Sequence, residues 1–587
     1  MLYVLLVSNT LAASKQTKFT ALKIAQTVRS TRFKLKGSLG IAIAGGTVAK
    51  LSHRRAAMRL DGEMKVLLYL TQLQSTVRPR LEALLSRIAS PTSCTVYLQV
   101  HSDVAKEWNL GRAFQFVRDV YEIVGSSNFS SKFRILTDSL KGMSDSGWMD
   151  NVDNLIVDCD PVEFSERFLP TDQSAFLPPW VTYVKPASLM SQFSNLRVTE
   201  AKPLDTSWAR REIGLFKHAA IGGTFDHMHV GHEMLLTCAA LAASKLTIGV
   251  AYGDLLYGKF LFGLVEPLDM RVYNINQFLA TIAPDLSFTC VPIADLYGPT
   301  LYDETMDCLI VSEETFEGGQ MINLKRADKG MSQLELVTID LLNIGSGTDG
   351  HVKISSTLKR VELLGHLFRA PKNRVNSNPY IIGLTGGIAS GKSKICEYLR
   401  SWGAHVINCD LLGHKAYQPY TAAYNEILNA FDEEIVDADT GQINRQALGA
   451  IVFKDENKRQ ILNRIVWPRI AEMVVEELRR VGQDSRIVVV EAAVLLEAGW
   501  ESLVHEVWLT YIPEGEAVKR VMERLKCTQK EALRRVHAQR FNSEDNFSCA
   551  NVVFCSLWEP ETTRAQILHI SYSLDSQSIG FKIVNHC

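Results

Sequence analysis

The sequence predicts an α/β protein of several domains, and three observations support this fold class. The chain has 587 residues, which is too long for a single hydrophobic core. Two glycine-rich loops, at 222–223 and 386–391, each follow a short apolar run and precede a stretch of helical character. The apolar runs are nearly continuous, as strands of a parallel sheet covered on both faces require. We therefore expect parallel sheets in which two strands end in a phosphate-binding turn.

Composition and charge narrow the class of protein. Apolar residues make up 46% of the chain and charged residues 22%, which is typical of a soluble globular protein. The formal net charge of −1 provides no global field for nucleic acid, so no nucleic-acid partner is expected. Eleven cysteines occur without a CxxC pair, which favours reduced thiols over a disulfide framework.

The first 60 residues are basic and contain no Asp or Glu. We interpret 1–60 as a targeting or peripheral-anchoring segment, which predicts a mitochondrial protein of the matrix or outer membrane and leaves a cytoplasmic fraction open. A secretory signal and a basic extension without targeting function remain alternatives. The apolar stretch Gly37–Ala49 is too short to span a bilayer, because a spanning helix needs about 20 residues.

Four further parts are expected along the chain. Residues 61–205 read as an α/β domain without a catalytic constellation, to which we assign a regulatory or packing role. Residues 216–365 and 380–566 each open with a strand, a glycine-rich loop and a helix. The tail 567–587 has few charges and no helical stripe, so we expect it to be poorly ordered and outside the preceding domain.

The first loop carries two histidines at the start of a helix. His229 and His232 are three residues apart, so their imidazoles face the same side. From there they donate hydrogen bonds to charge that develops on an α-phosphate during in-line displacement. The preceding glycines let the backbone approach a phosphate closely. The ATP-binding residues predicted in this loop are Gly222, Gly223, Thr224 and Phe225.

The run from Gly223 to His232 resembles the HxGH nucleotidyltransferase superfamily, whose pattern is G-T-F-D-x-x-H-x-G-H. A second superfamily element, I-S-S-T-x-x-R, is present at Ile354–Arg360. The resemblance implies a Rossmann-like domain with His229 and His232 as catalytic residues. It also implies that the second element binds ATP phosphates through Ser355, Ser356, Thr357 and Arg360.

Two charged residues between these elements match one branch of that superfamily. Lys259 and Arg271 agree in approximate spacing with the phosphate-binding Lys and Arg of phosphopantetheine adenylyltransferase. The resemblance implies that Lys259 binds the substrate and Arg271 binds ATP. The alternative interpretation is that either is a solvated surface charge.

The second loop matches the pattern GxxxxGKS in full. Its glycines expose amides to the β-phosphate of ATP, Lys392 bridges the β- and γ-phosphates, and Ser393 ligates Mg²⁺. The predicted ATP-binding residues here are Gly386, Gly387, Ile388, Ala389, Ser390, Gly391, Lys392 and Ser393.

Residues of about 380–560 are similar to dephospho-coenzyme A kinase. The resemblance implies a P-loop kinase domain in which Lys392 and Asp410 are catalytic, and Asp410 receives or orients the proton of the ribose 3′-hydroxyl. It further implies that Arg445 binds the acceptor and that Arg520 and Arg524, on a lid helix, bind ATP phosphates. Helical arginines at such spacings are also common as plain surface charge.

Five positions depart from the kinase pattern, and two of them, Asn551 and Ser556, lie in the segment where the family usually has A-D-x-V-I-x-N. Asn408 and Trp467 stand where the family usually has Asp and His, and Glu491 replaces an Asp near the metal. Because Lys392 and Asp410 are retained, activity is still expected.

Both halves in this order resemble the bifunctional coenzyme A synthase family. The resemblance implies ATP, 4′-phosphopantetheine and dephospho-CoA as substrates and Mg²⁺ as the cofactor. Two alternatives stay open: a different nucleotidyltransferase fused to another metabolite kinase, and a nucleotide-binding scaffold with one inactive site.

Overall fold

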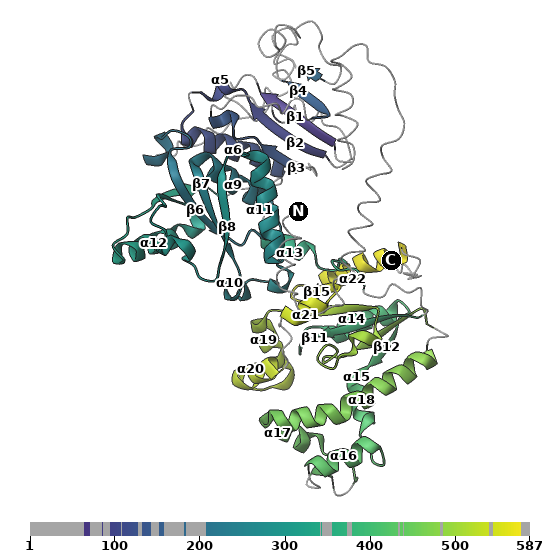
Figure 1. Ribbon diagram of the computed structural model, residues 1–587. Helices are drawn as coiled ribbons and strands as arrows, with labels where there is room; N and C mark the ends of the chain where they lie inside the picture. The colour runs from purple at the N-terminus through teal and green to yellow at the C-terminus, as the bar shows by residue number, and fades with distance from the viewer. Residues whose placement is uncertain are drawn as a thin grey trace, which may run out of the picture. The chain divides into compact units, whose positions relative to one another are not determined.

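A computed structural model of the chain shows three α/β units, each built around one sheet (Figure 1). They are called the first, second and third layer in chain order. The described residues are 64–70, 94–106, 108–126, 132–141, 152–157, 181–183, 207–340, 355–371, 379–431, 435–437, 440–481, 485–538 and 544–576, together with 81, 85 and 342. Apart from Met64, they all belong to one compact unit, Lys65–Cys587. The predicted targeting segment 1–60 lies outside the described residues and stays a prediction. None of the described helices combines the length and apolar character needed to cross a membrane.

Each layer is a five-stranded parallel sheet, which confirms the predicted α/β class. The first sheet has the strand order β3-β2-β1-β4-β5. Its strands are β1 (Met64–Leu70), β2 (Cys94–Val100), β3 (Lys132–Ile135), β4 (Asn154–Val157) and β5 (Val181–Tyr183). Its helices are α5 (Ser102–Ala105) and α6 (Leu110–Ser126).

The second sheet has the order β10-β9-β6-β7-β8. Its strands are β6 (Phe216–Gly223), β7 (Ala243–Ala251), β8 (Ser287–Ile293), β9 (Cys308–Ser312) and β10 (Glu335–Ile339). Its α-helices are α9 (Val230–Ala242), α10 (Asp254–Tyr257), α11 (Leu268–Ile282), α12 (Phe316–Asp328) and α13 (Ser356–Glu362). The chain builds outward from β6 through β7 and β8, then returns to place β9 on the other side of β6. This reversal creates a crevice at the carboxyl ends of β6 and β9.

The third sheet has the order β12-β13-β11-β14-β15. Its strands are β11 (Tyr380–Gly386), β12 (His405–Asn408), β13 (Ile487–Glu491), β14 (Glu506–Tyr511) and β15 (Val552–Cys555). Its helices are α14 (Lys392–Ser401), α15 (Cys409–Ala416), α16 (Ala422–Phe431), α17 (Arg445–Lys454), α18 (Glu456–Val481), α19 (Glu514–Leu525), α20 (Gln529–Ala538), α21 (Glu544–Cys549) and α22 (Pro560–Ser576). The central strand β11 ends in the second glycine-rich loop.

The first layer packs against the helix that carries the two histidines. Helix α6 lies along α9 (Figure 1). The Arg134 guanidinium donates a 2.6 Å hydrogen bond to the Glu233 carboxylate, one residue beyond His232. These contacts give the 61–205 region a packing role, while its regulatory role stays a prediction.

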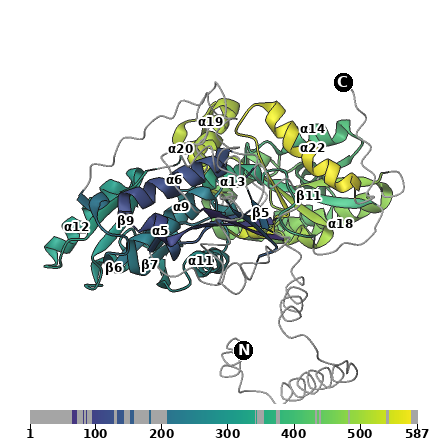
Figure 2. The same cartoon turned by 90° about the horizontal axis from the view of Figure 1, so that it is seen from above.

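The structure corrects the expectation for the start of the tail. Helix α22 continues through Ser576 and lies beside α14 (Figure 2). Ile567 and Ile570 are fully buried in the core of the third layer, three residues apart on one helix face. Burial of these two isoleucines stabilises the helix. The scarcity of charged residues did not predict it, because packing rather than surface polarity holds it. Residues 577–587 lie outside the described part.

Gly365 lies where this helix leaves no room for a side chain. Its φ is +74°, and a Cβ would fall 2.3 Å from the Gln566 carbonyl oxygen. Gly330 has φ +72° but open space around it. We expect Gly330→Ala to lower the free energy of unfolding by about 1 kcal/mol through backbone strain. Gly365→Ala adds a backbone clash and should cost about 2–4 kcal/mol in total. Urea unfolding of both variants measures the difference, and equal shifts would contradict the clash.

Candidate active sites

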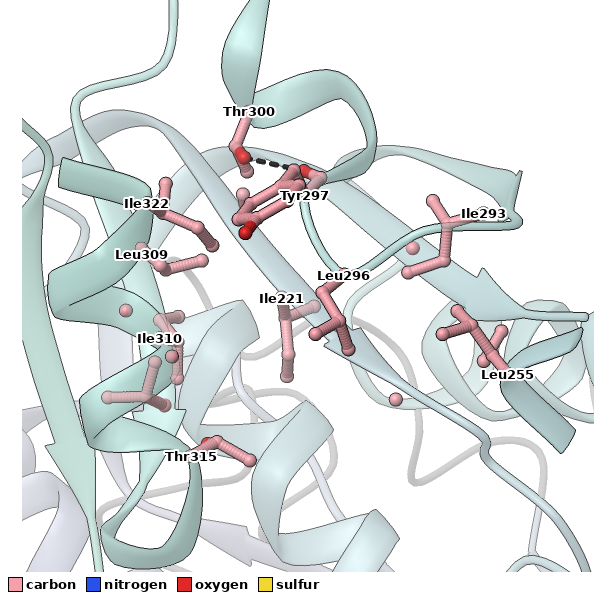
Figure 3. A pocket seen from close by; sticks show the side chains of 18 of the residues that line it. Ile221, Leu255, Ile293, Leu296, Tyr297, Thr300, Leu309, Ile310, Thr315 and Ile322 are labelled. Atoms are coloured by element: carbon pink, nitrogen blue, oxygen red, sulfur yellow. Dashed lines mark hydrogen bonds between the residues drawn. The ribbon is translucent and has the colours of Figure 1, made fainter. Parts of the chain in front are cut away.

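The first candidate site is a cavity of about 500 Å³ at the reversal point of the second sheet. Gly222, Gly223 and Thr224 line it at the end of β6, and Lys259 is the only cation among its described lining residues. Its wall is otherwise largely apolar. Figure 3 shows Leu296 and Tyr297, from the loop after β8, together with side chains of β6 and β9. The cavity therefore offers a backbone edge for phosphate beside an apolar wall for an extended substrate.

The two predicted catalytic histidines lie together next to Phe225, the residue after Thr224, and neither is among the described residues that line the cavity. His229 is the N-cap of α9, and its Nδ1 accepts a hydrogen bond from the Gly231 amide at 3.1 Å. Its ring stacks on that of His232 with centroids 4.0 Å apart. Because Nδ1 accepts, a neutral His229 carries its proton on Nε2. The buried Nδ1 of His232 has no hydrogen-bond partner among the described residues.

Both imidazoles are held in the neutral form. Burial lowers the pKa of His229 to about 4, and the Lys359 charge acts in the same direction. Burial also lowers the pKa of His232 well below its ordinary value, with His229 adding to the effect. At neutral pH the pair therefore offers N–H donors to a phosphate oxygen rather than positive charges.

These shifts predict a pH dependence of stability. The folded-state pKa values lie below the ordinary value of 6.5, so the unfolded chain takes up protons first as the pH falls. The stability contributed by neutral histidines is thus complete above pH 6.5 and is lost progressively toward pH 4. We expect the urea midpoint of the wild type to fall more between pH 7 and 5 than that of a His229→Gln/His232→Gln variant. Parallel pH curves would contradict this assignment.

The I-S-S-T-x-x-R element also lies near the first loop, because Arg360 reaches Asp226. Ser355 is the N-cap of α13 and accepts a hydrogen bond from the Leu358 amide at 3.3 Å, so Ser356 and Thr357 begin the helix. Arg360, which is 2% exposed, pairs with the Asp226 carboxylate and donates to the Phe260 carbonyl at 2.9 Å. Asp226 was missed by the sequence reasoning as a site residue, although the D of the G-T-F-D pattern was the available signal.

Arg271 is buried in the same way. Its guanidinium donates to the carbonyls of Glu266, Thr224 and Ala251 at 2.7–2.9 Å. Arg271 and Arg360 therefore fix the loops that surround the cavity, and their predicted contacts with ATP phosphates stay predictions.

The second candidate site is the P-loop after β11. Gly386 has φ +144°, and a Cβ there would fall 2.1 Å from Thr510 Oγ1, so only glycine fits. Gly391, at φ +97°, is the N-cap of α14. Lys392 Nζ donates to the carbonyls of Gly386 and Gly387 at 2.7 and 2.9 Å. Desolvation lowers the pKa of this ammonium, while Asp410 and Glu491 oppose the shift.

Side chains with oxygen atoms that could bind a metal lie near this loop, at the ends of neighbouring strands. Ser393 Oγ donates to Glu491 at 3.3 Å, and the Asn408 amide donates to the other Glu491 oxygen at 2.8 Å. At this position the Asn408 amide can donate to the Glu491 carboxylate, whereas an Asp at position 408 would repel that carboxylate. Asp410 stands exposed in the first turn of α15. Hydroxyl and carboxylate oxygens are the ligand set that Mg²⁺ prefers, so these residues fit the predicted metal.

The predicted lid arginines differ in their surroundings. Arg520 donates to Ser556 Oγ and O at 2.9 and 2.6 Å and to the Ala389 carbonyl at 3.3 Å. Arg524 is exposed, and its charge acts on Lys392. Ser556, which departs from the kinase pattern, was not predicted as a site residue, yet it joins the lid helix to the P-loop.

Arg445, the predicted acceptor-binding residue, is the first residue of α17. Its guanidinium contacts His414 Nδ1 at 3.1 Å. Both side chains belong to the exposed polar surface beyond Asp410, and acceptor binding by Arg445 stays a prediction.

The third layer has the features of a P-loop kinase. It combines a parallel sheet and a P-loop with a lysine that contacts the loop carbonyls, and carboxylates lie at the ends of neighbouring strands. Residues 380–556 match the family model for dephospho-CoA kinase. The dephospho-CoA kinase of Moorella thermoacetica is 44% identical over 163 residues, which are 27% of this chain and 76% of that protein. The chain therefore belongs, through this domain, to the dephospho-CoA kinase family.

The second layer has a relative of another kind. The phosphopantetheine adenylyltransferase of Saccharomyces cerevisiae is 39% identical over 149 residues, which are 25% of this chain. The chain spans about half the length of that protein, 48%.

Among solved structures, the dephospho-CoA kinase of Campylobacter jejuni is 24% identical and has a TM-score of 0.28, covering 34% of this chain and 98% of its own.

Proposed function

We propose that the chain catalyses two consecutive ATP-dependent reactions. At the first site ATP transfers its adenylyl group to 4′-phosphopantetheine, which gives dephospho-CoA and pyrophosphate. At the second site ATP phosphorylates the ribose 3′-hydroxyl of dephospho-CoA, which gives CoA. The observation that carries the first step is the neutral, stacked His229–His232 pair at the amino end of α9. His232 contacts Phe225, which follows Thr224 in the loop that lines the cavity together with Lys259.

The first reaction needs little beyond placed donors. The phosphate oxygen of 4′-phosphopantetheine attacks the α-phosphorus of ATP, and the bond to the β-phosphate oxygen breaks as pyrophosphate leaves. Charge builds on the α-phosphate oxygens, where neutral imidazole N–H groups and the free amides of α9 stabilise it. Lys259 holds the anionic end of the acceptor by charge.

The second reaction uses the groups around the P-loop. Asp410 receives the proton of the 3′-hydroxyl as its oxygen attacks the γ-phosphorus, and ADP leaves. Lys392 and Arg520 neutralise the phosphates. Ser393 and Glu491 would hold Mg²⁺, which shields the negative charge of the phosphate oxygens when bound.

Mass spectrometry of products tests this proposal with the full chain. Wild-type protein given 4′-phosphopantetheine and Mg-ATP should form CoA. His232→Ala should form neither dephospho-CoA nor CoA from 4′-phosphopantetheine, because the loss of one transition-state donor costs about 10²–10³-fold in rate. The same variant should still convert supplied dephospho-CoA to CoA, which serves as its internal control.

The other outcomes are equally informative. Conversion of dephospho-CoA alone by the wild type would reduce the proposal to the kinase step and favour a different acceptor at the first site. ATP binding without either product would favour the scaffold interpretation.

A further inference from the structure

A loop of the first site packs against the kinase domain. Residues 259–264 connect α10 to α11 and include the short 3₁₀ turn η4 (Phe262–Leu264). Leu261 and Leu264 are buried in one hydrophobic cluster with Leu509, Tyr511 and Phe547 of the third layer. The apolar side chains of the loop therefore pack on the kinase domain, whose family carries out a different reaction.

Aromatic contacts fix the loop from the kinase side. The Phe260 ring meets Tyr511 edge-on with centroids 5.9 Å apart, and Trp558 edge-on at 6.0 Å. On the other side of the loop, the Phe260 carbonyl accepts from Arg360. Phe260 is thus held by its ring in one domain and by its backbone in the other.

The backbone of the loop shows that this contact is close and constrains its shape. Leu261 has φ +54°, a left-handed conformation that a branched residue adopts only when its surroundings hold it. A Cβ at Gly263 would fall 2.0 Å from the Phe547 ring, so the chain runs directly against that ring. The loop conformation is therefore set by packing and not by local preference.

The residue that this loop presents to the first cavity is Lys259. Its ammonium donates no hydrogen bond to the described residues, and burial lowers its pKa, with Arg360 adding to the effect. The Asp226 carboxylate attracts the ammonium without a hydrogen bond, so the position of Lys259 depends mainly on the backbone of the loop.

We propose that Tyr511 and Trp558 of the kinase domain are positioning residues for the adenylyltransferase reaction, because through Phe260 they place Lys259 at the cavity that takes the anionic acceptor. This inference rests on the proposed first reaction. A disturbed loop should weaken acceptor binding in ground and transition states alike, which raises KM and spares kcat.

Trp558→Ala is the informative variant, because Trp558 is 38% exposed and lies outside the buried clusters of the kinase core. An edge-to-face pair lost between Trp558 and Phe260 corresponds to about a two- to tenfold effect. We expect KM for 4′-phosphopantetheine to rise by that factor with kcat unchanged, and Trp558→Phe to restore it. Trp402→Ala, a tryptophan at the far end of α14 that packs on Tyr398, is the matched control and should leave this KM unchanged.

A double variant separates positioning from general damage. If Trp558 acts through Lys259, the effect of Trp558→Ala on KM should disappear in a Lys259→Ala background. Full additivity of the two changes would overturn the proposal, as would an unchanged KM in Trp558→Ala.

Hydrogen exchange of the full chain provides a readout that needs no turnover. Backbone amides of 261–265 should exchange faster in Trp558→Ala than in the wild type or in Trp402→Ala. Unchanged exchange would overturn the proposal even if KM moved. A wild type that makes no dephospho-CoA would instead refute the proposed first reaction, while the exchange result would still decide whether the kinase domain holds the loop.

Discussion

Lys392→Ala should slow phosphorylation of dephospho-CoA by about 10²–10³-fold, because it removes a preorganised positive charge from the phosphate site. The ammonium already lies against the carbonyls of Gly386 and Gly387, inside the curve of the loop that would receive the β-phosphate. Among the described residues, no other lysine ammonium donates a hydrogen bond to this loop. Given 4′-phosphopantetheine and Mg-ATP, the variant should accumulate dephospho-CoA.

Lys394→Ala is the matched control. Lys394 lies two residues further along α14, where it forms an exposed pair with Glu397 at 2.8 Å. Exposed pairs of this kind contribute little to stability, so its loss should leave both reactions near wild-type rates. Coupled measurement of ADP release with supplied dephospho-CoA distinguishes the two variants. Near wild-type turnover by Lys392→Ala would show that the second site works without its P-loop lysine.

The sequence was sufficient to predict those parts of the fold in which the local hydrophobic pattern agrees with the burial that the tertiary structure imposes. The apolar runs before Gly222 and Gly386 became central strands of parallel sheets, because strands buried on both faces can be read from hydrophobicity alone. The P-loop motif carried an equally strong signal, since Gly386 and Gly391 have backbone angles and close contacts that side chains do not tolerate, whereas a Cβ at Gly222 would meet open space.

Prediction was weaker where a residue's surroundings come from distant segments. Arg271 and Arg360 were predicted as phosphate ligands from spacing, but their donors lie among protein acceptors supplied by other elements. The helix beyond Gln566 was missed because its stability comes from burial of Ile567 and Ile570, and propensity gave no hint of it. The contacts of Phe260 with Tyr511 and Trp558 link residues about 250 or more positions apart, which spacing does not reveal.

Arg360→Met should lower the free energy of unfolding by about 3–5 kcal/mol, because it leaves the Asp226 carboxylate buried without its cation. Asp226 is fully buried, and its other described contacts are the Glu266 amide at 2.8 Å and His227 Nε2 at 3.6 Å. The same change frees the Phe260 carbonyl and the loop that bears Lys259. We therefore expect the first reaction to be lost together with stability, as measured by urea unfolding and by dephospho-CoA formation.

A double-mutant cycle with Asp226→Asn shows whether the pair itself carries this effect. In Asp226→Asn/Arg360→Met neither charge of this pair remains buried, so the double variant should be more stable than Arg360→Met alone. Additive losses would mean that each residue acts through separate contacts. Strong coupling would show that a buried ion pair joins the G-T-F-D loop to the distant I-S-S-T-x-x-R helix. The two motifs are about 130 residues apart in sequence, and this pair is what makes them one site.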